Sequence, residues 1–262
     1  MYRALITAGT GMVAQQTNLD VIANNLANVN TVGFKSQRAE FQDMVYQTMR
    51  TSGASTGSTS NAPTSNQVGL GTRYAGNSTN FGQGGLQATG NPMEVAIQGD
   101  GFFQIELPDG SIAYTRDGSF KRNANGDMVT SDGYRVLPGI TIPAGATGLS
   151  IAANGAVTAQ LPGQDVAQTL ATIQIATFAN PSGLTRVGSN LFAAGGSSGE
   201  ATVADPGENG SGTLAASFVE GANVSIVEEM VRMILAQRAY EVNSKAIQSA
   251  DDMLSTLNQL KR

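Results

Sequence analysis

Apolar residues near the N-terminus recur every seven positions, which is the spacing of a coiled-coil seam. One series is Leu5, Met12, Leu19 and Leu26, and its companion is Ala8, Ile22 and Val29, with the polar Gln15 between them. The pattern predicts a helix of about 27 residues, roughly 40 Å long.

A second seven-residue series occupies the C-terminal part of the chain. Its members are Ile226, Met233, Tyr240, Ile247 and Leu254, accompanied by Ala236, Ala250 and Leu257 and interrupted by Asn243. Ser225 followed by Glu228 is a capping-box signal for a helix start, and neither Gly nor Pro follows before Arg262. This helix would be about 35 residues and roughly 50 Å long.

The two apolar stripes are suited to pack on each other. An ordinary helical hairpin docked on a domain would share the pattern, so the pattern leaves that alternative open. Because joining the two ends closes a loop of about 200 residues, we expect both helices to be poorly ordered in a monomer and to fold on assembly.

From Glu94 onward, short β-like runs alternate with turn signals. The runs begin at Val95, Phe102 and Ala113 and continue to about Phe192, and a Gly- and Ser-rich stretch from Gly195 to Gly212 follows. Each of the dipeptides Asp109-Gly110, Asp117-Gly118, Asn125-Gly126 and Asp132-Gly133 suits the positive φ of a tight turn. An all-β module is predicted.

Between the first helix and this module, residues 50–90 are rich in Ser, Thr, Gly and Asn. Such a segment is either a flexible linker or a segment that orders between subunits. The helix-compatible Phe41, Met44, Val45 and Tyr46 before it favour a fixed anchor.

The predicted fold class is α+β, with long coiled-coil-forming helices at the two ends packed together and flanking a central all-β domain. The predicted segments are an N-terminal helix (1–38), an extended connection (39–90), a central β domain (91–215) and a C-terminal helix (216–262).

Composition narrows the possible functions. The chain of 262 residues has a net charge of −5 and no block of Lys or Arg, which disfavours binding to nucleic acid. It has no Cys and no His, which excludes disulfides, thiolate sites and the commonest general base. Arg3 is followed by no apolar signal core, and no run approaches 18 apolar residues, so we expect a soluble chain without a cleavable signal.

Candidate ligand and catalytic groups fall in turns. Asn123, Asn125 and Asp127 imitate the start of a calcium loop, but Gly126 comes one place too early and Tyr134 stands where a Glu is required. Turn chemistry also accounts for the Asp residues beside glycine at 100, 109, 117 and 132. We therefore predict no enzyme activity, metal or cofactor.

The end of the first helix, residues 23–35, is unusually rich in Asn. Asn weakens a helix interior, so this composition needs a reason. One reading is helix termination, with Gly33 as the left-handed stop and Lys35 near the dipole. The other places amide side chains across a subunit interface.

These motifs resemble those of the flagellar axial proteins of rod and hook. Their N-terminal signature is similar to residues 23–28 and 31–35, and their C-terminal helix is similar to Gln237-Arg238-Ala239-Tyr240-Glu241-Val242-Asn243-Ser244-Lys245. In the middle, residues 99–103, 107–110 and 114–120 resemble the distal rod members in particular.

The resemblance implies a structural subunit that stacks head-to-tail into a helical tube and transmits motor torque to the hook, at the basal body between periplasm and outer membrane. The implied partners are other copies, proximal rod proteins, the hook protein, a rod or hook cap, the P- and L-ring proteins and the flagellar type III export apparatus. Another rod or hook subunit and a secreted carbohydrate- or cell-wall-binding module remain alternatives.

The interface residues expected on this basis come from both helices and the Asn-rich motif. They are Leu5, Met12, Leu19, Ile22, Asn24, Asn25, Leu26, Asn28, Val29, Gly33, Phe34, Lys35, Met233, Gln237, Arg238, Tyr240, Asn243, Ile247, Leu254 and Leu257.

Overall fold

The computed structural model describes residues 2–52, 64–161 and 166–260. The chain divides into two compact units. The helical unit comprises Met1–Leu26, Gln37–Ser78 and Ser225–Arg262, and the β unit comprises Ala27–Ser36 and Thr79–Val224. Of the predicted connection (39–90), residues 53–63 lie outside the described residues.

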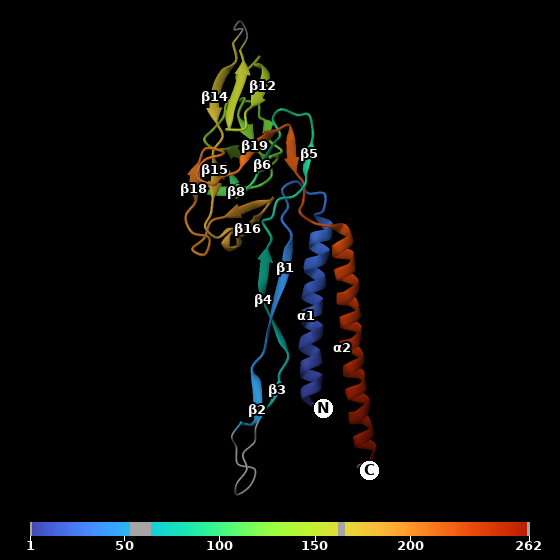
Figure 1. Cartoon of the computed structure of the whole chain (residues 1–262). Coiled ribbons are helices and arrows are strands. Elements are labelled where there is room, and N and C mark those ends of the chain that lie inside the picture. Colours follow the sequence, from blue (N-terminus) through green and yellow to red (C-terminus); the bar gives the residue numbers. More distant parts are fainter. Residues whose placement is uncertain (1, 53–63, 162–165, 261–262) are drawn as a thin grey trace. The chain divides into compact units, whose positions relative to one another are not determined.

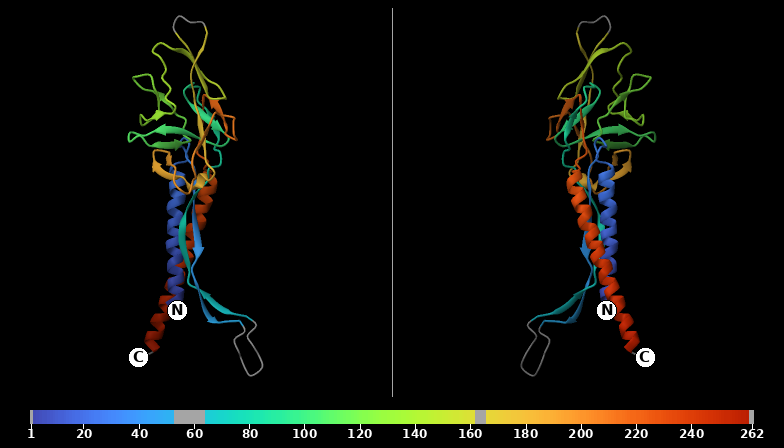
Figure 2. Two further views of the ribbon diagram at one scale, coloured as in Figure 1. Left: turned by 90° about the vertical axis from the view of Figure 1, so that its left-hand side faces the viewer. Right: turned by 90° about the vertical axis from the view of Figure 1, so that its right-hand side faces the viewer.

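Two long helices form much of the helical unit. Helix α1 spans Tyr2–Ala27 and helix α2 spans Ile226–Leu260. They lie side by side and run antiparallel, with the start of α1 and the end of α2 at the same end (Figures 1 and 2). Within the described residues, neither helix is apolar enough over a sufficient length to cross a membrane. The predicted helices at the two ends, flanking β structure, are confirmed.

Helix α2 starts where its capping signal placed it. Ser225 directly precedes the helix, and its carbonyl accepts a hydrogen bond from the Glu229 amide at 3.0 Å. Glu228 and Glu229 both lie in the first turn, where carboxylates interact favourably with the helix dipole.

Two β ribbons complete the helical unit. Strand β1 (Gln37–Asp43) pairs with β4 (Thr72–Thr79), and β2 (Tyr46–Arg50) pairs antiparallel with β3 (Asn66–Gly69). The helix compatibility assigned to Phe41 and Tyr46 is therefore wrong, because pairing with a distant segment draws both residues into strands.

The β unit contains sixteen short strands in the described ranges. Their bounds are β5 Leu86–Ala88, β6 Val95–Gln98, β7 Phe102–Glu106, β8 Ile112–Thr115, β9 Lys121–Arg122, β10 Met128–Val129, β11 Arg135–Val136, β12 Thr147–Ile151, β13 Ala156–Gln160, β14 Gln168–Thr172, β15 Ile175–Thr177, β16 Thr185–Gly188, β17 Leu191–Ala193, β18 Thr202–Ala204, β19 Thr213–Ala216 and β20 Phe218–Glu220. A single 3-10 turn, Pro181–Gly183, precedes β16.

The main sheet has the order β16-β17-β8-β7-β11-β10-β9, and β15 joins it by pairing with both β7 and β18. The strands β12, β13 and β14 form a separate three-stranded sheet, while β19 pairs with β6 and β20 with β5. The predicted Gly- and Ser-rich exit thus contains β18, which the sequence pattern did not indicate. Consecutive strands pair at β7–β8, β9–β10, β10–β11, β12–β13, β13–β14 and β16–β17, as the turn signals between them require. The other pairings, such as β6 with β19 and β5 with β20, join strands far apart in the sequence.

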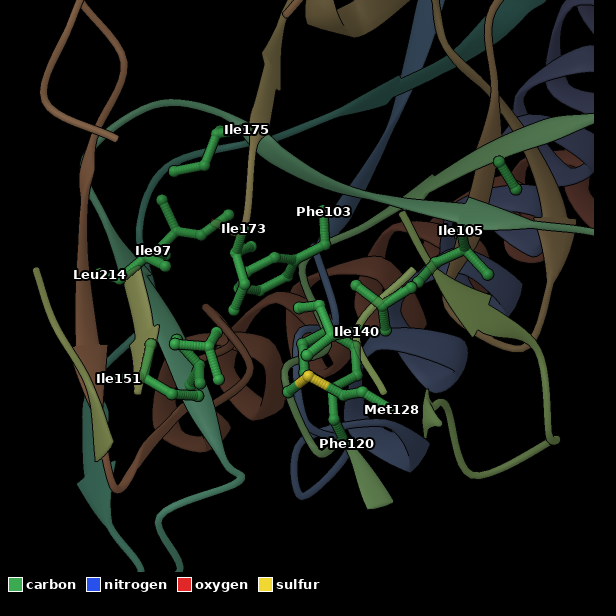
Figure 3. Packing of buried hydrophobic residues seen from close by; sticks show 14 of the residues in the cluster. Ile97, Phe103, Ile105, Phe120, Met128, Ile140, Ile151, Ile173, Ile175 and Leu214 are labelled. Carbon is green, nitrogen blue, oxygen red and sulfur yellow. The ribbon is translucent and has the colours of Figure 1, made fainter. Parts of the chain in front are cut away.

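Apolar side chains from several of these sheets form one core. Figure 3 shows Phe103, Phe120, Met128 and Ile140 converging there with isoleucines from β6, β7, β12 and β15. The Phe103 and Phe120 rings meet edge to face, with centroids 5.0 Å apart. Each buried aromatic or aliphatic side chain contributes about 1.5–3 kcal/mol, so this cluster is the main source of stability in the β unit.

The predicted turns form, with one difference in mechanism. Gly110, Gly126 and Gly133 have φ of 80°, 93° and 88°. Gly118 is not among the positive-φ glycines; instead, a Cβ at this position would lie 1.6 Å from the Val95 carbonyl oxygen. Glycine is needed there for close backbone approach, while Asp117 accepts hydrogen bonds from the Ser119 amide and hydroxyl.

Replacing Gly118 with Ala should therefore destabilise the β unit by about 3 kcal/mol or more, because the added methyl group meets fixed backbone. Urea denaturation followed by circular dichroism measures the change. Gly196→Ala is the matched control, since a Cβ there meets nothing within 4 Å. Equal midpoints for the two variants would contradict this account of Gly118.

Candidate self-assembly surface

The side-by-side helices bury only part of the predicted seam. Ala8, Ile22, Ala236 and Ala250 are buried. Partly buried positions are Leu5, Met12, Gln15, Leu19, Leu26, Met233, Asn243, Ile247 and Leu254. Tyr240 and Leu257 remain 41% and 48% exposed. The seven-residue series thus marks a face that one chain covers incompletely.

The polar interruption of the second series has a defined neighbour. A Cβ built on Gly11 of α1 would lie 2.8 Å from the Asn243 side-chain nitrogen. Asn243 therefore packs where α1 has no side chain. Sequence periodicity found Asn243 but not Gly11, because glycine carries no hydrophobic signal.

Helix α2 also exposes an apolar face that the seven-residue series missed. We call it the exposed α2 face, formed by Val227, Met230, Val231 and Ile234, whose exposures are 73%, 52%, 52% and 54%. Their spacing of i, i+3, i+4 and i+7 is itself a helical signal and was available in the sequence. A helix apolar on two sides needs partners on both.

The segment Gln237–Glu241 of α2, which belongs to the family-like motif, lies mostly on the surface. Gln237 and Arg238 are exposed, and Arg238 donates a 2.8 Å hydrogen bond to Glu241 one turn later. An exposed pair of this kind contributes about 0.3–0.5 kcal/mol to the helix. These side chains therefore contribute little to the stability of α2. They are exposed and available for contact with another molecule.

The Asn-rich end of α1 is mostly engaged within its own unit. Asn25 is 1% exposed and pairs with the Gln37 backbone twice: its amide donates to the carbonyl at 2.8 Å and its oxygen accepts from the Gln37 amide at 2.9 Å. The side chain thus imitates a neighbouring strand at the start of β1. Neither helix termination nor an intersubunit amide describes this role.

The turn after α1 uses the next asparagine. The Asn28 carbonyl accepts from the Thr31 amide at 3.0 Å, and its side-chain oxygen accepts from the Thr31 hydroxyl at 3.1 Å. Asn24 is exposed, Asn28 is half-buried, and Val29 lies in this turn beyond the helix.

Gly33 and Phe34 are fixed inside the β unit. Gly33 has φ of 68°, and its amide donates to the Glu220 carbonyl at 2.7 Å. Phe34 is 5% exposed, with the Arg186 guanidinium 5.1 Å above its ring centre. The predicted left-handed conformation of Gly33 is confirmed. Its amide hydrogen-bonds to the Glu220 carbonyl, so this glycine holds the chain against β20 several residues after α1 has ended.

Lys35 and Glu220 form a buried ion pair. The Lys35 ammonium lies 2.6 Å from one Glu220 carboxylate oxygen, and both side chains are fully buried. The ammonium also donates to the Gly82 carbonyl at 2.9 Å. Burial lowers the pKa of Lys35, and the Glu220 carboxylate opposes this shift.

Arg116 completes the cluster on the other side of Glu220. Its guanidinium lies 3.3 Å from the second carboxylate oxygen and donates to the Gly99 carbonyl at 2.8 Å. The Gly84 amide donates to Glu220 at 2.7 Å. Burial lowers the pKa of Arg116, again against the field of Glu220. With both carboxylate oxygens hydrogen-bonded, Glu220 is the shared centre of the two cations.

The buried members of the predicted interface set are therefore occupied inside their own chain. Ile22, Asn25, Gly33, Phe34 and Lys35 have almost no side-chain surface for a second subunit. The positions that present surface are the exposed and half-buried ones in the helices and in the turn after α1.

Among the described residues, no group of Asp and Glu could hold a metal ion. The Asn123 oxygen accepts from the amides of Asn125 and Asp127, which closes the loop as a turn. Asp127 accepts from the Thr141 hydroxyl at 2.8 Å, and this bond lowers the pKa of its carboxyl group.

Three family models match separate parts of the chain. A model described as flagella basal body rod protein matches residues 5–35, the flagellar hook protein FlgE/F/G D1 domain matches 96–159, and the flagellar basal body rod FlgEFG protein C-terminal model matches 215–260.

Whole-length relatives agree with these matches. The flagellar basal-body rod protein FlgG of Borreliella burgdorferi is 50% identical, with 100% of both chains covered. That of Caulobacter vibrioides is 49% identical over 99% of each chain. A flagellar basal-body rod protein FlgF, from Mesorhizobium japonicum, is 33% identical over 98% of each.

The chain belongs to the flagellar basal-body rod protein family. It is a structural rod subunit of the flagellar basal body, as its resemblance to the axial proteins implied. The first and third matched regions contain the two partners of the buried ion pair, Lys35 and Glu220.

Glu220→Gln should destabilise this rod protein by about 3–5 kcal/mol, because Lys35 and Arg116 would stay buried without their anion. Urea denaturation is the measurement. Glu241→Gln, at the exposed pair with Arg238, is the control and should change stability by no more than about 0.5 kcal/mol. A loss below about 1 kcal/mol for Glu220→Gln would refute the assigned role of the cluster.

Asn25→Ala should expose the start of β1, because the Gln37 amide and carbonyl lose both partners at a cost of about 1–3 kcal/mol. Hydrogen exchange of residues 37–43 should accelerate while that of the β unit core stays unchanged. The exposed Asn30 provides the control variant Asn30→Ala. Unchanged exchange at Gln37 in Asn25→Ala would contradict the strand-imitating role.

Proposed function

We propose that this rod protein is the distal rod subunit and that its copies assemble head-to-tail into a helical tube that transmits motor torque to the hook. The stronger similarity to FlgG than to the FlgF relative supports the distal assignment over another rod subunit. Heterologous contacts that do not close into a ring generate such a filament.

The observation that carries the proposal is the exposed α2 face. Four apolar residues on one face of α2, Val227, Met230, Val231 and Ile234, are exposed in a single chain. Full burial of one such side chain contributes about 1.5–3 kcal/mol, and covering the exposed half or more of each of the four would contribute roughly half of that or more, which in combination favours association. Assembly uses this face in addition to the incompletely covered seam.

The seam packs as a coiled coil in this proposal. Leu5, Met12, Leu19 and Leu26 of α1 face the α2 series from Met233 to Leu254, and neighbouring subunits cover what one chain leaves exposed. Tyr240, Leu257, Gln237 and Arg238 extend the contact, together with Asn24, Asn28 and Val29 at the end of α1. Asn25 supports assembly indirectly by fixing the start of β1 in the helical unit, and Gly33, Phe34 and Lys35 do so by fixing the chain within the β unit.

The proposed surroundings follow from the distal position. Proximal rod proteins lie at one end of the tube and the hook protein at the other. A rod or hook cap guides growth, and the P- and L-ring proteins surround the tube from the periplasm to the outer membrane. The flagellar type III apparatus exports the subunit without a cleavable signal.

A carbohydrate-directed module or hydrolase has less support. Hydrolysis of a glycosidic bond requires a pair of free carboxyl groups. Asp109 accepts hydrogen bonds from the Ser111 amide and hydroxyl, and Asp117 accepts the equivalent pair from Ser119. Both carboxylates are used in turns, so we assign this subunit no catalytic role.

Ile234→Asp tests the proposal, because it places a charge in the exposed α2 face without entering the core of the chain. Electron microscopy of concentrated protein should show tubes for the native chain and none for the variant, while circular dichroism shows equal folding. The control Gln248→Asp adds a charge at another exposed position of α2 and should assemble. Normal tubes from Ile234→Asp would remove this face from the interface; no tubes from the native chain would count against self-assembly itself.

A further inference from the structure

A groove of about 560 Å³ runs through the helical unit between α1, β1 and α2. Apolar side chains supply much of its lining. They include Val21 and Ile22 from α1, Phe41 from β1, and Leu235, Ala236 and Ala239 from α2. We call this the α1–β1–α2 groove.

A buried carboxylate in the groove has one oxygen without a partner. Glu229 is 4% exposed, and its first oxygen accepts a 3.0 Å hydrogen bond from Arg232. Its second oxygen has no donor among the described residues. Arg38 and Arg232 also line the groove, and neither donates to that oxygen. A buried acceptor left this way costs free energy until a donor arrives.

We propose that the groove receives the first turns of α1, around Tyr2 to Ile6, from a second copy of the chain. This inference rests on the proposed self-assembly and deepens it by naming the two surfaces that meet. The Glu229 carboxylate would accept hydrogen bonds from the donors at that helix end, and the apolar lining would cover its apolar side chains.

The start of α1 has the chemistry that the groove lacks. Tyr2 and Ile6 are 78% and 53% exposed. The first amides of a helix have no acceptor within the helix and carry partial positive charge. Arg3 adds a cation, which donates to the Met49 sulfur at 3.4 Å, and the first turn of α1 has no acidic residue.

The occupant has to come from another copy. Ile6 and Ile22 are 16 residues apart on one straight helix, or about 24 Å along its axis. A copy cannot bend its own α1 into its own groove. Because the groove and the helix end are different surfaces of the same unit, their contact is heterologous and repeats into a filament.

The opposite helix end is the competing occupant. The last turns of α2 expose Met253 and Leu257, but they also carry Asp251 and Asp252. Carbonyl groups at a helix C-terminus bear partial negative charge. Neither feature suits an unpartnered carboxylate oxygen, so within the described residues charge favours the start of α1 over the last turns of α2.

Cross-linking on assembled tubes tests the contact, since the native chain has no cysteine. Copies carrying Ala239→Cys are mixed with copies carrying Ile6→Cys, assembled, and treated with a short bismaleimide. Mass spectrometry should identify peptides linked between positions 239 and 6. Ala239→Cys with Gln248→Cys is the control mixture and should give none.

Each outcome separates this inference from the proposed function. Tubes without the 239–6 link, or with a link to Leu257→Cys in its place, would overturn the groove assignment and leave self-assembly standing. Absence both of tubes and of the 239–6 link, in every mixture and with no tubes from the native chain, would overturn both. Discrete dimers linked through 239 and 6, without tubes, would support the contact and contradict filament formation.

A second measurement addresses the carboxylate. Glu229→Gln keeps the side-chain shape and removes the charge, so the concentration needed for assembly should rise by about tenfold or more, as expected for a charge-assisted hydrogen bond. The exposed Glu241→Gln should leave it unchanged. Unaltered assembly by Glu229→Gln at equal helicity would remove Glu229 from the contact.

Discussion

The buried ion pair between Lys35 and Glu220 is the interaction on which the rest of this chain depends. It joins residues 185 positions apart, one soon after α1 and the other shortly before α2. Asn223 reinforces the connection by accepting from the Ser36 amide at 2.7 Å and donating to the carbonyls of Asn80 and Gly82. The entropy of closing so long a loop is thus offset inside the β unit, where a large core supports it.

A charged connection also selects one arrangement more strictly than an apolar one. Removing two charges from water is expensive, and that cost is recovered only when every partner is in place. Glu220 meets Lys35, Arg116 and the Gly84 amide together, so a shift of one residue in β20 would leave buried charges unpaired. We infer that the cluster fixes the register of β20 against its neighbours. Glu220→Gln removes the central charge of the cluster and leaves the rest of the chain unchanged.

The sequence predicted those parts of the fold whose cause is local. The seven-residue series and Ser225 fix the helices, and Asp-Gly or Asn-Gly pairs fix the turns, because periodicity and turn chemistry act over a few residues. The ribbons β1–β4 and β2–β3 were missed, since their pairing depends on segments far apart and without alternating patterns. Lys35 was assigned to a surface for the same reason: a lysine is buried only when a distant residue such as Glu220 supplies its counter-charge.

The two units differ in the groups that they bury and expose. This difference suits a subunit that is a monomer before it joins the assembly. In the β unit, the buried Lys35 ammonium and the Glu220 carboxylate are paired with each other within one chain. In the helical unit, Val227, Met230, Val231 and Ile234 remain in water, and one oxygen of Glu229 has no donor. A second copy can cover these apolar side chains and donate to this oxygen, which lowers the free energy of both copies. The unsatisfied groups of the helical unit are therefore the physical basis for polymerisation.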